Sequence, residues 1–209
     1  MYTIEFVIRE KNKYECRNKN RNNPSLKISP EQAWATYKNA DLIHSEKVVK
    51  QAFESMVTAI DADFRNLNPL LVCVMNGGVI PFAELLTRLQ FPLQTDYIHV
   101  TRYGGKLIGG HTSWLVEPHS DPEGRHVLVI DDILDEGETL ASIIDYYNDK
   151  KAASVRSAVL VVKDRPRKID YMADYVGLHV PDRYVFGCGM DYKGYLRNLT
   201  GIYAENAKE

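Results

Sequence analysis

Short apolar runs that alternate with helix-like segments constrain the fold of this chain more than any other feature of its sequence. Runs of strand length are almost continuously apolar, and stretches with apolar residues at helical spacing separate them. Continuous apolar strands joined by helices are typical of a parallel sheet that is covered on both faces. The sequence therefore predicts an α/β fold. The expected strands are residues 70–75, 97–101, 127–130 and 155–162, and the expected helices are residues 48–60, 79–89 and 140–147.

The two ends of the chain differ from this regular centre. Residues 1–40 form an N-terminal extension, in which Ser29 and Gln32 have the spacing of a capping box around Pro30 at a first helical position. We expect residues 41–165 to form the core domain. In residues 166–209 the pattern shortens into loops and strand fragments, which should complete the core. Together with the N-terminal extension, this segment should make a small lobe over the sheet edge.

Composition excludes several classes of protein. The chain has 209 residues and a formal net charge of -2, which fits one large domain with a small lobe and lacks the basic excess of a general nucleic-acid binder. No apolar run approaches the ~20 residues that cross a bilayer. The cysteines, Cys16, Cys73 and Cys188, are odd in number and widely spaced, which does not indicate a disulfide framework. We therefore expect a cytoplasmic protein that binds neither nucleic acid nor membrane.

The segment from Asp131 to Thr139 is the most informative for function. The apolar run 127–130 is followed by two carboxylates, two apolar residues, the sequence Asp-Glu-Gly-Glu-Thr and a helix. Ligands of parallel α/β sheets bind beyond the carboxyl ends of the strands, and a helix N-terminus favours a phosphate. Carboxylates at such a strand end suit ribose hydroxyls and hydrated Mg²⁺. A solvated acidic turn with helix caps is the alternative, but the joint pattern is rare, so we favour a site for a phosphorylated ribose.

A long glycine-rich stretch, residues 102–125, has no clean periodicity. A loop of this length in a compact domain is usually functional, often as a lid, or else disordered. A lid would suit transfer from a phosphorylated ribose, because a cationic ribose intermediate has to be kept from water.

The segment from Asp131 to Thr139 resembles the phosphoribosyl-pyrophosphate motif of type I phosphoribosyltransferases. Residues 41–204 as a whole resemble the purine branch of that family, the hypoxanthine-guanine phosphoribosyltransferases, because further motifs follow in the family's order. These are Met75-Asn76-Gly77-Gly78 in the place of the pyrophosphate loop, Arg102-Tyr103 at the start of a lid, Lys163 after an apolar strand, the purine-binding segment Pro181-Asp182-Arg183-Tyr184-Val185-Phe186-Gly187, and the C-terminal Met190-Asp191-Tyr192 with Tyr195 and Arg197.

The resemblance implies a parallel sheet flanked by helices, with a small hood lobe built from the N- and C-terminal segments. It also implies Mg²⁺-dependent transfer of ribose 5-phosphate from phosphoribosyl pyrophosphate to hypoxanthine or guanine, giving IMP or GMP and pyrophosphate. A homodimer or homotetramer is usual in the family. Small molecules, the phosphoribosyl pyrophosphate and a 6-oxopurine base, are then the expected partners.

The resemblance also assigns roles to single residues. It implies that Asp131 and Asp132 approach the ribose hydroxyls and the metal, and that Asp135 is the general base. The remaining roles are the 5′-phosphate loop Glu136, Gly137, Glu138 and Thr139; the pyrophosphate loop Asn76, Gly77 and Gly78 with Arg197; the 6-oxo contact Lys163; the stacking ring Tyr184; backbone groups of Val185; and a second Mg²⁺ ligand, Asp191. Taken singly, each of these residues also has an ordinary structural explanation, such as a surface lysine or a turn cap.

Two departures from the family's pattern bear on the phosphates. Asn76 stands where many purine enzymes of this type carry a lysine, and Arg102 could restore the lost charge. Glu136 and Glu138 would repel a phosphate if they faced it, so we expect them to face solvent. Two other interpretations stay open: a xanthine-preferring phosphoribosyltransferase, and a regulatory nucleotide-binding protein on the same fold.

Overall fold

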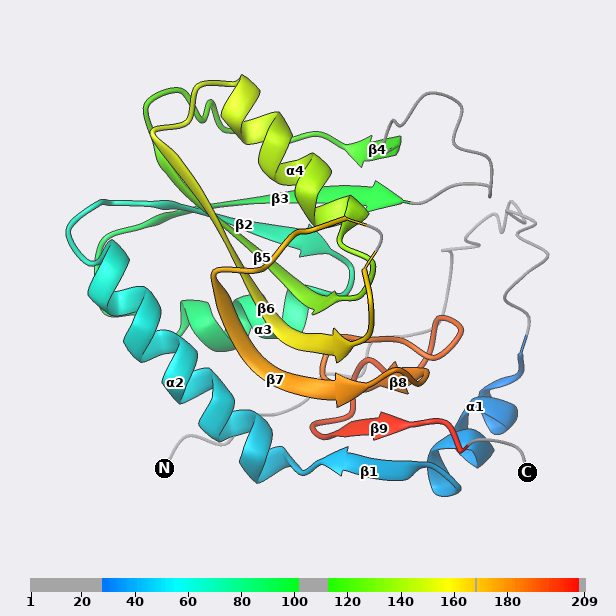
Figure 1. The fold of residues 1–209 in the computed structure, drawn as a ribbon. Helices are drawn as coiled ribbons and strands as arrows, with labels where there is room; N and C mark the ends of the chain where they lie inside the picture. Colours follow the sequence, from blue (N-terminus) through cyan, green and yellow to red (C-terminus); the bar gives the residue numbers. More distant parts are fainter. Residues whose placement is uncertain (1–27, 102–112, 168, 207–209) are drawn as a thin grey trace, which may run out of the picture.

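A six-stranded sheet forms the centre of the computed structural model, which describes residues 28–101, 113–167 and 169–206 (Figure 1). The strand order is β4-β3-β2-β5-β6-β7. All neighbouring strands are parallel except β3 and β4. The strands are β2 (Leu70–Met75), β3 (Gln94–Thr101), β4 (Ser113–Val116), β5 (His126–Leu134), β6 (Ser154–Asp164) and β7 (Tyr175–Pro181). The mostly parallel α/β fold predicted from the apolar runs is confirmed.

Helices cover both faces of this sheet (Figure 1). The helices α2 (Glu46–Phe64) and α3 (Val79–Leu86) lie on one face, and α4 (Glu138–Asp149) lies on the other. Alternate residues of β2 show the division, because Leu71 packs with α2 and α3 whereas Leu70 and Val72 pack with α4. The helical stripe expected in residues 48–60 is confirmed as core. Its fully buried members are Val49, Ala52, Phe53, Met56 and Ile60.

A second, three-stranded sheet joins the two ends of the described chain. It has the order β1-β9-β8, with β1 (Asp41–His44), β9 (Ile202–Ala204) and β8 (Val185–Phe186) paired antiparallel. The short helix α1 (Pro30–Lys38) contributes Ala33 to a small apolar cluster that includes Phe186 of β8. We refer to β1, β9 and β8 with α1 as the hood. Its capping box is present as expected, since Ser29 and Gln32 exchange side-chain and backbone hydrogen bonds.

Several expected boundaries were wrong. Strands β5 and β6 run to Leu134 and Asp164, past the apolar residues, because the two strands stay paired beyond the apolar cores. Strand β4 lies inside the stretch that we expected to have no regular structure, where it pairs with β3 as an edge strand. Strand β7 is a full member of the large sheet, although residues 166–209 were expected to hold only fragments.

Two further sequence expectations concern burial and membranes. Cys73 and Cys188 are buried free thiols, and burial raises the pKa of each to about 12. Cys16 lies outside the described residues. No helix among the described residues combines the length and the apolar character that a membrane span requires.

Candidate active site

The strand order puts the point at which the direction of winding reverses between β2 and β5. After β2 the chain returns through α3 to β3 on one side, and after β5 it returns through α4 to β6 on the other. Where the direction of winding reverses in an open parallel sheet, the loops at the carboxyl ends separate and leave room for a ligand. The loop of Asn76, Gly77 and Gly78 follows β2. The segment from Asp131 to Thr139 begins within β5 and continues beyond its end. The predicted phosphoribosyl and pyrophosphate loops are therefore neighbours.

Asp131 and Asp132 lie within β5 and not after it, so the expectation of a strand that ends in two carboxylates was wrong. Asp131 pairs in register with Val159 of β6, and its carboxylate accepts a hydrogen bond from the Asp132 backbone N–H at 2.8 Å. The Asp132 carboxylate lies against the loop after β2, where a Cβ atom added to Gly77 would overlap it. Glycine is needed at position 77 because the carboxylate approaches the backbone so closely.

The two carboxylates resist ionisation. Burial raises the pKa of Asp131 well above its ordinary value, and the neighbouring Asp132 carboxylate adds to the shift. Burial also raises the pKa of Asp132. The Arg197 guanidinium lies 3.9 Å from the Asp132 carboxylate. A half-buried acidic pair of this kind gains from a further positive charge nearby.

The loop between β5 and α4 has the conformation expected of a phosphate site. Gly137 has a φ of 85°, a left-handed conformation that favours glycine, and its carbonyl accepts the N–H of Ala141 in the first turn of α4. The first N–H groups of a helix have no partner within the helix and attract anions. Glu136 and Glu138 are half-buried, so they do not simply extend into solvent as expected. That Glu136, Gly137, Glu138 and Thr139 hold a phosphate stays a prediction.

The predicted general base and the predicted purine contact meet at the ends of β5 and β6. The Lys163 ammonium donates a hydrogen bond to the Asp135 carboxylate at 3.1 Å, and only 13% of the Lys163 side chain is exposed. Asp182, two residues before Tyr184, lies 3.9 Å from the same ammonium. The sequence did not point to a fourth member, Arg165, which lies 3.3 Å from Asp135 and 3.5 Å from Asp182. Nothing in the sequence around Arg165 indicates that its side chain contacts Asp135 and Asp182.

The C-terminal signature contacts Asp132 of β5 and the loop that follows β2. The Arg197 guanidinium lies 2.6 Å from the Asp191 carboxylate and donates to the Gly189 carbonyl at 2.6 Å. Gly189 packs against the backbone of Gly77, at a φ of 104°. Asp132, Gly77, Gly189, Arg197 and Asp191 thus form one connected set of contacts. The structure brings together residues that the sequence placed in three separate motifs.

Replacing Gly189 by alanine should destabilise the protein by about 2–4 kcal/mol, because a Cβ there meets the Gly77 carbonyl and the left-handed conformation is itself unfavourable. Gly124 is a matched control, with a φ of 69° and open space where the methyl group of an alanine would lie. Alanine at position 124 should cost only about 1–2 kcal/mol. Urea unfolding of both variants measures the difference. Equal losses would mean that the close contact with Gly77 has no energetic weight.

The purine-binding segment lies at the junction of the hood and the large sheet. Val185 is buried in β8 and pairs with Ala204 of β9, which fixes its backbone. The ring of Tyr184 is 47% exposed and meets the ring of Tyr192 edge-on at 5.3 Å. An exposed aromatic face next to the Asp182–Lys163 contact is where a planar base could stack. The stacking role of Tyr184 and the backbone role of Val185 remain predictions.

Part of the expected lid falls on residues that the structure does not describe. Arg102 and Tyr103 lie outside the described residues. On the other side of this gap, Asp96 of β3 accepts the backbone N–H groups of His119 and Ser120 at 2.8 and 2.7 Å. These backbone hydrogen bonds hold the pKa of Asp96 below its ordinary value although burial opposes them. Nothing in the sequence singles out Asp96, which is one polar residue near the start of a strand.

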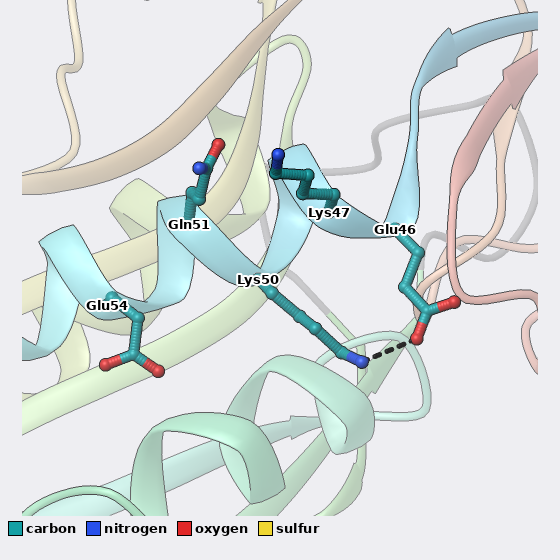
Figure 2. Close-up of a pocket in the computed structure, with 5 residues that line it drawn as sticks. All are labelled: Glu46, Lys47, Lys50, Gln51 and Glu54. Carbon is teal, nitrogen blue, oxygen red and sulfur yellow. Dashed lines mark ion pairs between the residues drawn. The ribbon is translucent and has the colours of Figure 1, made fainter.

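A surface hollow beside α2 lies apart from the predicted site. It is lined by charged and polar side chains of that helix only, and Lys50 pairs with Glu46 across it at 2.6 Å (Figure 2). None of the residues that carry the phosphoribosyltransferase resemblance lines it. The residues of the hollow are Glu46, Lys47, Lys50, Gln51 and Glu54.

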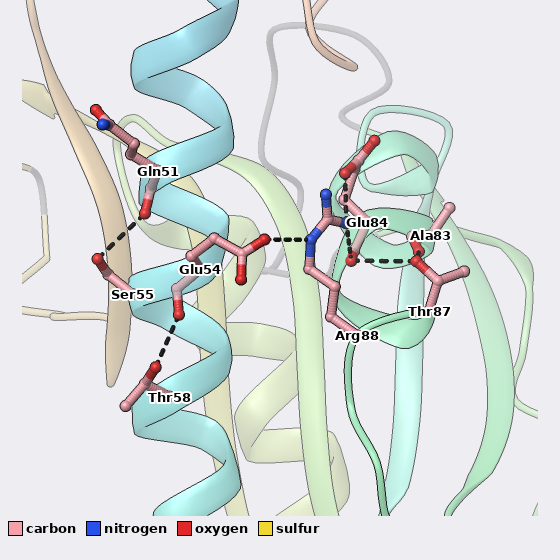
Figure 3. A network of polar contacts seen from close by, with 8 residues as sticks. All are labelled: Gln51, Glu54, Ser55, Thr58, Ala83, Glu84, Thr87 and Arg88. Atoms are coloured by element: carbon pink, nitrogen blue, oxygen red, sulfur yellow. Dashed lines mark hydrogen bonds and ion pairs between the residues drawn. The ribbon is translucent and has the colours of Figure 1, made fainter.

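A polar network fixes the helix that follows the pyrophosphate loop. Arg88, after α3, contacts Glu54 of α2 at 2.9 Å and Glu84 of α3 at 2.5 Å (Figure 3). Its guanidinium also lies over the ring of Phe53, 5.9 Å from the centroid. Since α3 begins directly after Gly78, this attachment to α2 helps to hold the loop of Asn76 in place.

Comparisons with known proteins agree with this geometry. A family model described as a phosphoribosyl transferase domain matches residues 39–193. The hypoxanthine-guanine phosphoribosyltransferase of Streptococcus thermophilus (strain CNRZ 1066) is 35% identical over 162 residues, which cover 77% of this chain and 90% of the relative. The enzyme of the same name from Bacillus subtilis (strain 168) is 31% identical over 159 residues, covering 76% of this chain and 88% of the relative.

Solved structures show the same fold. A hypoxanthine phosphoribosyltransferase from Staphylococcus aureus superposes with a TM-score of 0.77 at 27% identity, covering 82% of this chain and 95% of that one. A hypoxanthine phosphoribosyl transferase from Trypanosoma cruzi gives a TM-score of 0.75 at 28% identity, covering 79% and 91% of the two chains. The family model and the sequence relatives show that the chain belongs to the phosphoribosyltransferase family, in its hypoxanthine-guanine branch, and the solved structures agree.

Proposed function

We propose that this phosphoribosyltransferase transfers ribose 5-phosphate from phosphoribosyl pyrophosphate to hypoxanthine or guanine, and so acts in purine salvage. The products are IMP or GMP and pyrophosphate. The relatives named above carry the corresponding activity in their names. The observation in this chain that most strongly supports the proposal is the 3.1 Å contact between Asp135 and Lys163 at the ends of two adjacent strands. With this spacing, the proposed base Asp135 and the proposed oxo-group donor Lys163 could both contact the same purine ring.

Each residue then has a definite task. Asp135 takes the proton from the imidazole nitrogen of the purine as that nitrogen attacks the ribose. Lys163 donates to the 6-oxo oxygen, Tyr184 stacks on the ring, and backbone groups of Val185 meet its far edge. The N–H groups of the loop from Glu136 to Thr139 bind the 5′-phosphate. Loss of pyrophosphate leaves cationic character on the ribose, which the acidic pair Asp131 and Asp132 stabilises.

The leaving pyrophosphate requires positive charge, and the donors around it fit Mg²⁺. The described residues contain no group of three or more histidine, cysteine or acidic side chains that could hold a metal by themselves. Mg²⁺ is commonly held by one or two carboxylates together with substrate phosphates and water. The half-buried pair Asp131 and Asp132, and Asp191 near Arg197, provide such carboxylates. When bound, the ion neutralises charge on the leaving group, while Arg197 and the Asn76 loop bind the remaining oxygens.

Removal of divalent metal should abolish the activity, because the pyrophosphate would then leave with its charge unneutralised. Asp191→Ala should raise the Mg²⁺ concentration needed for half-maximal rate, since the substitution removes one of the proposed ligands. A Mg²⁺ titration of the wild-type enzyme and of this variant, each first stripped with chelator, measures both effects. Full activity in excess chelator would contradict the metal requirement.

A substrate panel tests the proposed function most broadly. The purified protein is incubated with phosphoribosyl pyrophosphate, Mg²⁺ and one base at a time: hypoxanthine, guanine, xanthine, adenine or uracil. We expect nucleotide formation with hypoxanthine or guanine and release of pyrophosphate in equal amount. A rate that is highest with xanthine would favour the xanthine-preferring alternative. Binding of phosphoribosyl pyrophosphate without turnover of any base, combined with RNA or DNA retention in a filter assay, would favour the regulatory alternative.

Three broader features belong to the same proposal. The hood, preceded by residues 1–27, forms the small lobe beside the base site. The protein acts in the cytoplasm on small molecules, and it assembles as a homodimer or homotetramer. Light scattering on the purified protein measures the assembly state directly.

A further inference from the structure

The proposed base Asp135 belongs to a ring of four charged side chains in which negative and positive groups alternate. The other three are Lys163, Asp182 and Arg165. Lys163 contacts one carboxylate oxygen of Asp135, and Arg165 contacts the other, at 3.1 and 3.3 Å. The same two cations also lie 3.9 and 3.5 Å from a single oxygen of Asp182. Two positive and two negative groups thus form a closed, neutral ring. Two of the four, Asp135 and Lys163, have direct tasks in the proposed reaction.

Local geometry puts the two cations on one side of the chain. Lys163 lies in β6 and Arg165 directly follows the last residue of that strand, and both side chains reach Asp135 and Asp182, whereas Asp164 between them pairs with His179. A hydrogen bond from the Arg165 N–H to the Lys163 carbonyl, 3.0 Å, turns the backbone at this point. The pairing of β6 with β7 carries Asp182 to the same place, because Asp164 is opposite Pro181. The ring therefore follows from the ends of three adjacent strands.

The two cations differ in what they must do when a base enters. Lys163 has to direct one of its three donors to the 6-oxo oxygen, so its charge is then shared between the base and the two carboxylates. Arg165 has several donors in a rigid fork and can bind two carboxylates at once. The Nε of Arg165 is buried and has no hydrogen-bond partner among the described residues, so this N–H can still donate one hydrogen bond. Of these two cations, Arg165 can keep Asp135 and Asp182 paired while Lys163 binds the base.

We propose that Arg165 is a positioning residue for the purine half-reaction: it holds the Asp135 and Asp182 carboxylates and so allows Lys163 to turn to the 6-oxo group. This inference rests on the proposed function and extends it to a residue outside the motifs that carry the family resemblance. Without Arg165, Lys163 becomes the one cation of the ring for two carboxylates. Moving it toward the substrate would then leave the half-buried Asp135 with a weaker charged partner, whereas Asp182 is exposed to solvent.

Arg165→Met should therefore lower kcat/KM for hypoxanthine and guanine by about 10-fold or more, the size of coupling found between charged neighbours. The KM for phosphoribosyl pyrophosphate should stay unchanged, because the ring faces the base and not the phosphates. Arg165→Lys should fall between the wild type and Arg165→Met, since an ammonium restores the charge but not the fork. Steady-state kinetics with each substrate varied in turn measures these effects.

The double variant Arg165→Met with Asp182→Asn is the decisive arm of the experiment. It removes one charge of each sign, so the remaining members of the ring, Lys163 and Asp135, balance each other and Lys163 no longer serves two carboxylates. We expect this double variant to recover most of the activity lost in Arg165→Met. A merely structural role for Arg165 predicts the opposite, a further loss when a second member of the ring is removed.

Arg65→Met is the matched control, because Arg65 pairs with Asp61 at the end of α2, outside the residues of the proposed site. It should leave the kinetics unchanged. Thermal unfolding of every variant separates kinetic effects from loss of fold. If the wild type forms nucleotide but Arg165→Met has unaltered base kinetics, or if Asp182→Asn deepens its defect, the positioning role is overturned while the proposed function stands. A wild type that uses no purine overturns both.

Discussion

Asp135→Asn should lower kcat by about 10²–10⁴-fold, the range that general acid–base groups contribute. The amide keeps the size of the carboxylate, so the contacts of Asp135 with Lys163 and Arg165 are weakened without leaving a cavity. It cannot take the proton that the purine nitrogen must release on attack. The substitution also removes a negative charge, so binding of phosphoribosyl pyrophosphate should not weaken. Steady-state kcat and the KM for phosphoribosyl pyrophosphate measure these two parts separately.

Asp164→Asn is the control for that substitution. Asp164 is a carboxylate at the same end of the sheet, next to Lys163 in sequence, but its side chain pairs with His179 and is 61% exposed. Its replacement should leave kcat unchanged, which would show that loss of any carboxylate at this end is not enough. If Asp135→Asn turned over at the wild-type rate with an intact fold, Asp135 would have no role as a base.

Lys163→Met should lower the preference for 6-oxopurines over adenine by roughly 10²-fold. The ammonium has three donors and no acceptor, so it matches an oxo group and faces the hydrogens of the 6-amino group of adenine. We expect kcat/KM for hypoxanthine to fall by roughly 10²-fold, since a hydrogen bond to a charged group is lost and Asp135 and Asp182 lose a partner. Activity on adenine should change little, because adenine never made that bond. Kinetics with each base give the two values.

A rival explanation of Lys163 is that it contacts a phosphate. In that case Lys163→Met would raise the KM for phosphoribosyl pyrophosphate and would lower activity on all bases equally. The geometry favours the base, because Lys163 is joined to Asp135 and Asp182, whereas Arg197 is joined to Asp132 and Asp191 on the side of the pyrophosphate loop. The KM for phosphoribosyl pyrophosphate in this variant decides between the two explanations.

The centre of the fold could be predicted because its physical signals are local. Continuous apolar runs mark buried parallel strands, and the stripe through Phe53 and Ile60 marks a helix packed on one face. The acidic segment after residue 130 was also visible as a site, because carboxylates next to a buried strand are costly unless a ligand uses them. Its boundary was wrong, since β5 continues to Leu134 through pairing with β6, and pairing has no signature in the apolar pattern.

The features that sequence reasoning missed all depend on distant partners. Strand β4 is an edge strand whose only sheet neighbour among the described residues is β3, and its short sequence shows no alternation strong enough to predict a strand. Arg165 reaches Asp135 from 30 positions away in the chain. Asp96 is an ordinary polar residue until the backbone of His119 and Ser120 is placed against it. In each case the side chain's role is set by tertiary contacts, which a single sequence does not encode locally.

The ratio of kcat/KM for hypoxanthine to that for adenine, measured with the wild-type enzyme, phosphoribosyl pyrophosphate and Mg²⁺ in one assay, tests the central claim most directly. A site built to hydrogen-bond a substrate group rejects an analogue that lacks it by roughly 10⁴–10⁵-fold. With Lys163 and Asp135 facing the base as proposed, the ratio should lie in that range and guanine should behave as hypoxanthine does. A ratio near one, or a preference for adenine, would contradict the proposal that the site around Lys163 and Asp135 binds 6-oxopurines.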